Sequence, residues 1–255
     1  MANDRSPLKD KPLRNPGQSM DDQLKDLLYD TLLTPFLVAV VACVLAGLEW
    51  WRFVHPMPPA PKTYTVMAVI VVVYSVLRIW RIWPQIRQLK LGRDGERVVG
   101  QYLERLREQS YQVFHDVIGR DFNLDHVVIG PAGIFTIETK TRTKPARGNS
   151  KVMFDGAKIL VNGFEPDRDP VIQAKAQASW LRALLNESTG RTLEVRPVIV
   201  FPGWFVEQRP GSKREVWVLE PKALPSFLAN EPDVLSAEDV KLVSFHLSRF
   251  VRTQV

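Results

Sequence analysis

Two long apolar runs stand out in the first third of the chain. Residues 31–48 and residues 64–77 carry no charged side chain, and each run is followed by tryptophans. About 20 apolar residues cross the hydrocarbon core of a bilayer, and tryptophan favours its interface. A proline-rich segment, residues 55–61, lies between the runs and would break a helix. The pattern predicts a two-helix transmembrane hairpin over residues 31–83; the alternative is a pair of buried helices in a soluble protein.

Basic residues indicate the orientation of this hairpin. The link holds only Arg52 and Lys62 near the membrane, whereas five cations crowd the exit of the second run: Arg78, Arg81, Arg87, Lys90 and Arg93. Because cytoplasmic loops carry the excess of lysine and arginine, we expect a two-span protein of the inner or plasma membrane with both termini in the cytoplasm. Residues 1–30 are polar and contain three prolines, which predicts a disordered tail running into a short helix.

The part of the chain after the second run begins with a helical pattern. Five apolar residues recur at helical spacing between positions 91 and 106: Val98, Val99, Tyr102, Leu103 and Leu106. Glu96 lies in the first turn, where the helix dipole alone would favour an acidic residue. This helix would open a cytoplasmic domain of about 170 residues, which is an ordinary domain size.

A short hairpin pattern at residues 125–140 carries the chemistry of this domain. Apolar and β-branched residues run on either side of Gly-Pro-Ala-Gly at positions 130–133, which predicts two strands joined by a tight turn. Alternation along a strand puts Glu138 and Lys140 on one face, and folding at the turn brings Asp125 alongside Glu138. Two acids and a lysine therefore converge at one edge of the sheet. A solvated surface salt bridge is the alternative interpretation.

The remaining pattern predicts a mixed α/β layer. We expect a strand over residues 111–118, a hairpin over residues 151–161 turning at Asp155, a helix over residues 171–185 and a buried strand over residues 195–201. In the helix, Ile172, Ala176, Trp180, Leu181 and Leu184 would form the apolar stripe, with Gln173 in the first turn. Residues 202–255 would be a C-terminal extension with a short strand and an amphipathic helix ending near residue 251.

Composition narrows the function classes. The net charge of +6 permits an acidic partner such as nucleic acid or an anionic membrane face. A single cysteine, Cys43, excludes a disulfide framework and a cysteine-based zinc cluster, and the chain lacks both a His-x-x-x-His pair and a glycine-rich phosphate loop. Four cations follow the hairpin, at Arg142, Lys144, Arg147 and Lys151. They could contact phosphates, and a merely solvated loop is the alternative.

Four short motifs in order resemble a known family. Gly95-Glu96, the aspartate strand 125–130, the Glu-x-Lys strand 133–140 and Asp-Pro-Val-Ile-Gln-Ala at 169–174 are similar to the nuclease-related domain, NERD, of the PD-(D/E)XK nuclease superfamily. The resemblance covers residues 91–201 and implies a restriction-endonuclease-like mixed sheet flanked by helices. Three positions depart from the usual family pattern: Asn123, Thr139 and Thr141.

The resemblance implies a metal site. Phosphodiester hydrolysis needs a hard divalent cation, Mg²⁺ or in its place Mn²⁺, and Asp125 and Glu138 would be its carboxylate ligands. Similarity to the superfamily adds the backbone carbonyl of Thr139 as a ligand and Glu96 as an assisting group. Lys140 would orient the water and offset charge in the transition state, and Gln173 would fix Lys140 or a phosphate. His126 points to the opposite strand face from Asp125, so we expect it to be a packing residue rather than the base.

The sequence therefore predicts a membrane-anchored, divalent-metal-dependent nuclease that hydrolyses DNA or RNA in the cytoplasm. Its partners would be nucleic acid and the lipid bilayer. The alternative is a membrane-tethered module that binds or senses nucleic acid without cutting it. The C-terminal helix could dock a membrane-protein partner, and a homo-oligomer stays open.

Overall fold

The computed structural model describes residues 13–55, 61–144, 151–208 and 215–253. The chain forms two compact units, which are described separately below. One unit is helical and comprises Ser19–Lys90, and the other contains the residues up to Gln18 together with Leu91–Val255. Residues 202–255, predicted as an extension, thus belong to the same compact unit as the hairpin.

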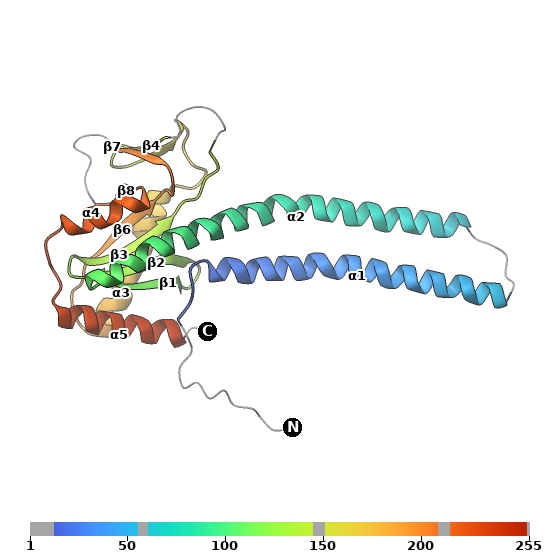
Figure 1. Cartoon of the computed structure of the whole chain (residues 1–255), viewed down its shortest axis with the longest axis horizontal. Helices are drawn as coiled ribbons and strands as arrows, with labels where there is room; N and C mark the ends of the chain where they lie inside the picture. The colour runs from blue at the N-terminus through green and yellow to red at the C-terminus, as the bar shows by residue number, and fades with distance from the viewer. Residues whose placement is uncertain (1–12, 56–60, 145–150, 209–214, 254–255) are drawn as a thin grey trace, which may run out of the picture. The chain divides into compact units, whose positions relative to one another are not determined.

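The helical unit consists of α1 (Gln18–Val54) and the first part of α2 (Pro61–Glu104) (Figure 1). Both helices are long and apolar enough to cross a membrane by length and composition, with a mean hydropathy of 1.8 for Phe36–Val54 and 1.9 within Thr65–Gln109. None of either apolar window is buried, and Trp50 and Trp80 are 72% and 74% exposed. Helices buried in a soluble core, the alternative prediction, would hide these side chains.

Helix α2 continues through Pro84 and carries on into the second unit. The sequence predicted a second span and a separate helix from residue 91, and the structure joins them. A proline inside a helix removes one backbone hydrogen bond, but the residues on both sides of Pro84 have helical patterns and continue the helix. The last turns of α2 carry Glu96, and a short 3-10 helix, Arg105–Gln109, follows.

A five-stranded mixed sheet is the centre of the second unit. Its order is β1-β2-β3-β6-β8; β1, β2 and β3 are antiparallel neighbours, while β6 runs parallel to both β3 and β8 (Figure 1). The strands are β1 (Gln112–Ile118), β2 (Asn123–Gly130), β3 (Gly133–Thr139), β6 (Val195–Val200) and β8 (Trp217–Leu219). The predicted mixed α/β class is confirmed.

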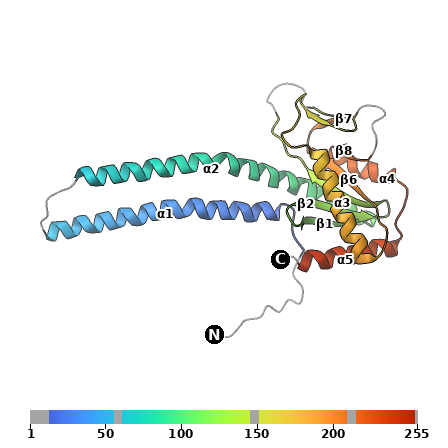
Figure 2. The ribbon, with the colours of Figure 1, turned by 180° about the vertical axis from the view of Figure 1, so that it is seen from behind.

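Helices cover both faces of this sheet. Side chains from the end of α2 and from α4 (Leu224–Ala229) pack against one face, in a core that includes Phe135 and Ile137. The other face packs against α3 (Pro170–Thr189) and α5 (Ala237–Thr253), which lie together in Figure 2. Strand β8 and helix α5 come from the predicted extension, and both complete the main core.

The buried face of α3 differs from the predicted stripe. Ile172 is 68% exposed and Ala176 is also exposed, so the predicted phase of the stripe is wrong at the start of the helix. The residues of α3 that face inward are Pro170, Val171, Ala174, Gln177, Ala178, Leu181 and Leu185. A polar residue, Gln177, therefore occupies an inward position, which its contacts in the site explain below.

A smaller second sheet lies in the same unit. Strands β4 (Lys151–Phe154) and β5 (Ile159–Val161) form the predicted hairpin, and β7 (Phe205–Gln208) pairs parallel to β4. Backbone N–H groups of the turn donate to the Asp155 carboxylate, as expected for an Asp-Gly turn. Strand β7 has little apolar pattern and was not predicted. This sheet has its own apolar cluster, which includes Phe154 and Trp204.

Candidate active site

The β2–β3 hairpin positions the two acids that the sequence singled out. His126 pairs with Ile137 and Gly130 with Gly133, so continuing this register by one residue places Asp125 opposite Glu138. The backbone N–H of Thr139 donates to Oδ2 of Asp125 at 2.6 Å. This bond fixes the carboxylate at the beginning of β2 to the end of β3.

Glu138 is the most heavily hydrogen-bonded acid in the site. Its Oε1 accepts from Nζ of Lys140 at 2.7 Å and from Nε2 of Gln173 at 2.7 Å, while its Oε2 accepts from Nε2 of Gln177 at 2.6 Å. Lys140 also donates to Oε1 of Gln173 at 2.9 Å. The structure therefore brings together the predicted residues Asp125, Glu138, Lys140 and Gln173.

Gln177 was missed by the sequence analysis. It is 2% exposed and also donates to the backbone carbonyl of Asn123 at 3.2 Å, so its amide joins α3 to the start of β2. Residues four apart on a helix lie on the same face, and Gln173 and Gln177 therefore reach Glu138 side by side. That spacing was the one signal in the sequence that could have identified Gln177.

Glu96 reaches the site from the helix on the other face of the sheet. It is 4% exposed, and a backbone hydrogen bond from Gly17 supports its carboxylate. The preceding Gly95 permits this approach, because a Cβ at that position would overlap the side chain of Thr141 just beyond β3. Burial, followed by the nearby charges of Asp116 and Glu138, raises the pKa of Glu96 to about 8.

The acids of the site repel one another. Burial, then the charges of Glu138 and Glu96, raises the pKa of the Asp125 carboxyl well above its usual value, although the Thr139 N–H and the Lys140 ammonium act in the opposite direction. Asp125 and Glu138 thus share the Lys140 ammonium, and the charge of Glu96 adds to the repulsion. A cation bound among them would relieve this repulsion, since an opposite charge stabilises the ionised form.

The donor set fits a hard cation with few protein ligands. Asp125, Glu138 and the backbone carbonyl of Thr139 offer only oxygen, which Mg²⁺ prefers, and Mg²⁺ keeps several waters in such sites. Within the described ranges there is no group of three or more His, Cys, Asp and Glu residues placed to hold a metal ion. The metal site would therefore rest on two carboxylates, a backbone oxygen and water, and the charge of Glu96, which acts on Asp125, would add to its attraction for a cation.

Asp116 is a further acid that the sequence did not single out. It lies between the ladder pairs His115–His126 and Val117–Leu124, and so falls opposite Asp125. Asp116 is 2% exposed and has a left-handed backbone, with φ at 51°. Nε of Arg14 donates to its Oδ2 at 2.6 Å. The sequence assigned Arg14 to a disordered tail, and no local pattern links two residues so far apart.

His126 is a packing residue, as predicted. It is fully buried, and its Nδ1 lies 2.8 Å from Nδ1 of His115, whose Nε2 lies 2.8 Å from Oε1 of Glu104. Burial lowers the pKa of both histidines, and for His126 the neighbouring His115 lowers the pKa further. Neutral imidazoles on the face opposite Asp125 are not placed to act as the catalytic base.

The predicted basic loop is only partly described. Arg147 lies outside the described residues, and Lys151 begins β4, where its Nζ pairs with Glu207 at 3.0 Å. The side chain of Lys144 lies over the Trp204 ring, 5.8 Å from its centroid, and Nε1 of Trp204 donates to the carbonyl of Arg142 at 3.3 Å. Trp204 therefore anchors the chain just beyond Lys140.

A cavity of about 340 Å³ adjoins the Lys140 side of the site. Its lining combines basic, apolar and amide side chains with one acid: Lys140, Arg142, Val161, Pro166, Asp167, Arg168, Pro170, Gln173 and Phe201. Lys140 and Gln173 thus contact Glu138 and also line an open space large enough for part of a ligand.

Comparison with known proteins gives a match over part of this unit. Residues 91–202 match the family model described as "NERD: Nuclease-related domain". These residues are a nuclease-related domain. The resemblance noted in the sequence is therefore confirmed, and with it the relation to the PD-(D/E)XK superfamily. Glu96, Asp125, Glu138, Lys140 and Gln173 all lie inside the NERD domain.

The chain is also similar to part of another protein. The chain is 39% identical over 54 residues to an uncharacterized protein of Bacillus anthracis, in an alignment that covers 19% of this chain and 26% of that protein. It thus spans about a quarter of the length of this relative. No solved structure gives a significant match to the chain.

Proposed function

We propose that the NERD domain is a divalent-metal-dependent nuclease that α1 and α2 anchor to a membrane. The observation that carries the proposal is the Glu138 carboxylate, which lies in register with Asp125 and accepts a hydrogen bond from Lys140 at 2.7 Å. Two acids and a lysine at one sheet edge suit phosphodiester hydrolysis, where a metal and a cation must act on the same phosphate.

The acids of the site would hold the ion. Asp125, Glu138 and the carbonyl of Thr139 are its proposed ligands, and Glu96 would position the water bound to it. When bound, Mg²⁺ or Mn²⁺ supplies a Lewis acid that polarises the phosphate and lowers the pKa of the attacking water. The hydrogen bond from the N–H of Thr139 would hold the Asp125 carboxylate in position for the ion, and the hydrogen bond from Gln177 would do the same for the Glu138 carboxylate.

Lys140 would act on the phosphate itself. Its side chain is 26% exposed, and its ammonium donates to both Glu138 and Gln173, so it reaches the acids and also lines the adjoining cavity. A fixed positive charge there offsets the negative charge that grows on the phosphate oxygens in the transition state. Gln173 accepts from Lys140 and limits its motion, which lowers the cost of orienting the ammonium during the reaction.

The helical unit supports membrane anchoring. No part of its two apolar windows is buried, and an aqueous protein would not leave such windows uncovered. The cations that follow the second window, from Arg78 to Arg93, favour a cytoplasmic location for the NERD domain under the positive-inside rule. We therefore propose a two-span protein of the inner or plasma membrane whose termini and active site face the cytoplasm.

The test is cleavage by the full chain in detergent micelles. Labelled single- and double-stranded DNA and RNA are incubated with Mg²⁺ or Mn²⁺, beside Asp125→Asn, Lys140→Ala and the matched control Lys175→Ala. Lys175 is an exposed lysine of α3 that pairs with Glu215. We expect EDTA to stop cleavage, the first two variants to lose roughly a hundredfold in rate, and the control to retain it. Cleavage that survives in both site variants would refute the proposal.

One observation favours a second candidate, a membrane-tethered module that binds nucleic acid without cutting it. Both carboxylate oxygens of Glu138 already accept side-chain hydrogen bonds, and the described ranges hold no metal cluster of three His, Cys, Asp or Glu residues. This module would show salt-sensitive binding of nucleic acid but no metal-dependent turnover in the same assay.

A further inference from the structure

The cavity beside Lys140 has two chemically different sides. Lys140, Arg142 and Arg168 supply positive charge, whereas Val161 and Phe201 are apolar walls. Such a pairing suits a ligand that carries an anion next to a flat or weakly polar group. We call this space the Arg168 cavity, because Arg168 is the lining cation that lies outside both the candidate catalytic site and the predicted basic loop.

The guanidinium groups of Arg142 and Arg168, the two arginines of the Arg168 cavity, differ from several other exposed cations of this unit. Among the described residues, neither makes an ion pair, whereas Lys151, Lys158, Lys175 and Arg182 each pair with a glutamate. Both are exposed. Their charges are therefore available to an external anion.

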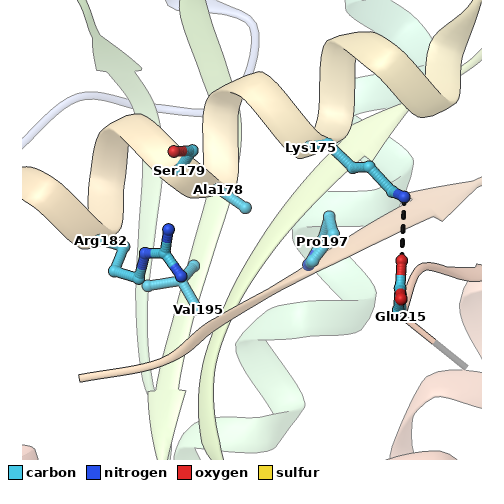
Figure 3. A pocket seen from close by; sticks show the side chains of 7 residues that line it. All are labelled: Lys175, Ala178, Ser179, Arg182, Val195, Pro197 and Glu215. Carbon is cyan, nitrogen blue, oxygen red and sulfur yellow. Dashed lines mark hydrogen bonds and ion pairs between the residues drawn. The ribbon is translucent and has the colours of Figure 1, made fainter. Parts of the chain in front are cut away.

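A second cavity along α3 shows the contrast. It has a volume of about 200 Å³ and is lined by Lys175 and Arg182 (Figure 3). There Lys175 pairs with Glu215 at 3.0 Å and Arg182 with Glu194 at 3.3 Å. Both of its cations are paired within the protein, whereas in the Arg168 cavity only Lys140 is paired, with Glu138.

Hydrogen bonds and packing contacts hold the backbone near both Arg142 and Arg168. Trp204 donates to the carbonyl of Arg142, and the adjacent Thr141 packs against Gly95. Arg168 directly precedes Asp169, whose carboxylate caps α3 by accepting from the N–H of Val171 at 2.8 Å. A cation on an ordered backbone loses less entropy when it binds an anion, so these positions suit recognition.

We propose that the Arg168 cavity binds one nucleotide of a single-stranded nucleic acid, with Arg168 and Arg142 on the phosphate next to the one that Lys140 contacts. Its volume of about 340 Å³ lies at the lower end of ligand pockets, which hold roughly 300–1,000 Å³. A base and its sugar can enter against the apolar walls, but a base-paired duplex cannot. The guanidinium groups of the two arginines can each donate two hydrogen bonds to a phosphate. The Asp167 carboxylate can accept a hydrogen bond from an amino group of the base or a hydroxyl group of the sugar.

The inference rests on the proposed function, since it takes the bound strand to be the substrate, but binding can be measured without cleavage. Fluorescence anisotropy of a labelled single-stranded 12-mer, as DNA and as RNA, is recorded with the full chain in detergent micelles and EDTA. A closed hairpin duplex without single-stranded ends is the competitor. Variants are Arg168→Ala, Arg168→Lys and the matched control Arg182→Ala.

We expect tighter binding of the single strand than of the duplex. Arg168→Ala should weaken it about tenfold and reduce the slope of log affinity against log salt by about 0.7, the value for one phosphate contact on a single strand. Arg168→Lys should keep the wild-type slope of log affinity against log salt, because it keeps the charge. It should bind more weakly than the wild type, because an ammonium cannot make the paired hydrogen bonds of a guanidinium. Arg182→Ala should match the wild type.

Several outcomes would overturn the inference. These are equal binding by Arg168→Ala and Arg182→Ala, equal binding of strand and duplex, and no binding of either by the wild type. The proposed function fails separately. Binding that depends on Arg168 but is not followed by cleavage in Mg²⁺ or Mn²⁺ would refute the nuclease activity and support the nucleotide-binding role of the Arg168 cavity. Cleavage with an unchanged KM in Arg168→Ala would support the nuclease activity and refute the role of the cavity.

Discussion

Arg14 and Asp116 form a buried ion pair, with Nε of Arg14 2.6 Å from Oδ2 of Asp116, although 102 residues separate them. Their side chains are 8% and 3% exposed. Asp116 falls opposite Asp125 in the β1–β2 register and its charge acts on Glu96, so the segment before α1 contacts the surroundings of the candidate site. The segment before α1 is therefore part of the same compact unit as the NERD domain.

Removing Arg14 should destabilise this unit. Arg14→Ala removes the guanidinium that pairs with the buried Asp116 carboxylate, and breaking a buried pair in this way costs about 3 kcal/mol or more. Urea unfolding of the full chain in micelles, followed by tryptophan fluorescence, measures the loss. Arg14→Lys should lose less because it keeps the charge. The control is Arg182→Ala, whose pair with Glu194 is largely exposed and should contribute little. Equal losses for Arg14→Ala and the control would contradict the prediction.

Gln177 should contribute to stability through Glu138. Gln177→Leu removes the donor to Oε2 of Glu138 and leaves a buried carboxylate oxygen unsatisfied, which should lower the free energy of unfolding by about 1–3 kcal/mol. Glu138→Leu in the same background should then cost less than in the wild type, because the partner is already gone. We expect the double variant to fall short of additivity by at least about 0.5 kcal/mol. Strictly additive effects would show that the two side chains do not act together.

Gly95 should tolerate a side chain only if Thr141 loses its own. A Cβ at Gly95 would overlap three atoms of the Thr141 side chain, so Gly95→Ala should destabilise by about 1–3 kcal/mol. In a Thr141→Gly background the same substitution should be neutral or stabilising, since alanine favours a helix over glycine by about 1 kcal/mol. Unfolding curves of the four chains measure this reversal of sign. An equal loss in both backgrounds would mean that other contacts exclude the side chain.

The buried histidine pair should make the fold sensitive to acid. The folded state holds the pKa of His115 and His126 below the usual value, so the unfolded chain binds more protons below about pH 6.5. Stability is therefore fully present above that pH and falls as the pH drops, with a slope approaching about 1.4 kcal/mol per pH unit for each histidine. Glu104, Arg107 and Asp116 are the charged groups that act on His115.

His126→Leu tests this pH dependence. The variant removes the more strongly affected imidazole, so its free energy of unfolding should decrease less steeply between pH 6.5 and pH 5 than that of the wild type. The measurement is a set of urea unfolding curves at fixed pH in the same detergent. Identical slopes for the two proteins would show that acid acts through other groups.

Local patterns were sufficient to predict most of the elements and the centre of the site. The two-residue period of a strand and the Gly130–Gly133 turn placed Asp125, Glu138 and Lys140 together, and the structure confirms that arrangement. The phase of α3 was predicted wrongly because the stripe was chosen by hydrophobicity. Gln177 faces inward because Glu138 and the carbonyl of Asn123 accept its hydrogen bonds, which compensate for burying an amide.

The sequence by itself determined the apolar windows, the strand hairpin and the residue types of the candidate site, because each depends on side chains that are close along the chain. Only the tertiary structure decided that Arg14 neutralises Asp116, that β7 pairs with β4, and that Arg142 and Arg168 line one cavity with Lys140. These contacts join segments far apart in sequence, and their formation depends on how the whole core packs rather than on any local period. Tertiary contacts also decide the environment of the β2–β3 hairpin. Glu138 is not a solvated surface acid but a buried one, and it accepts hydrogen bonds from two glutamines of α3.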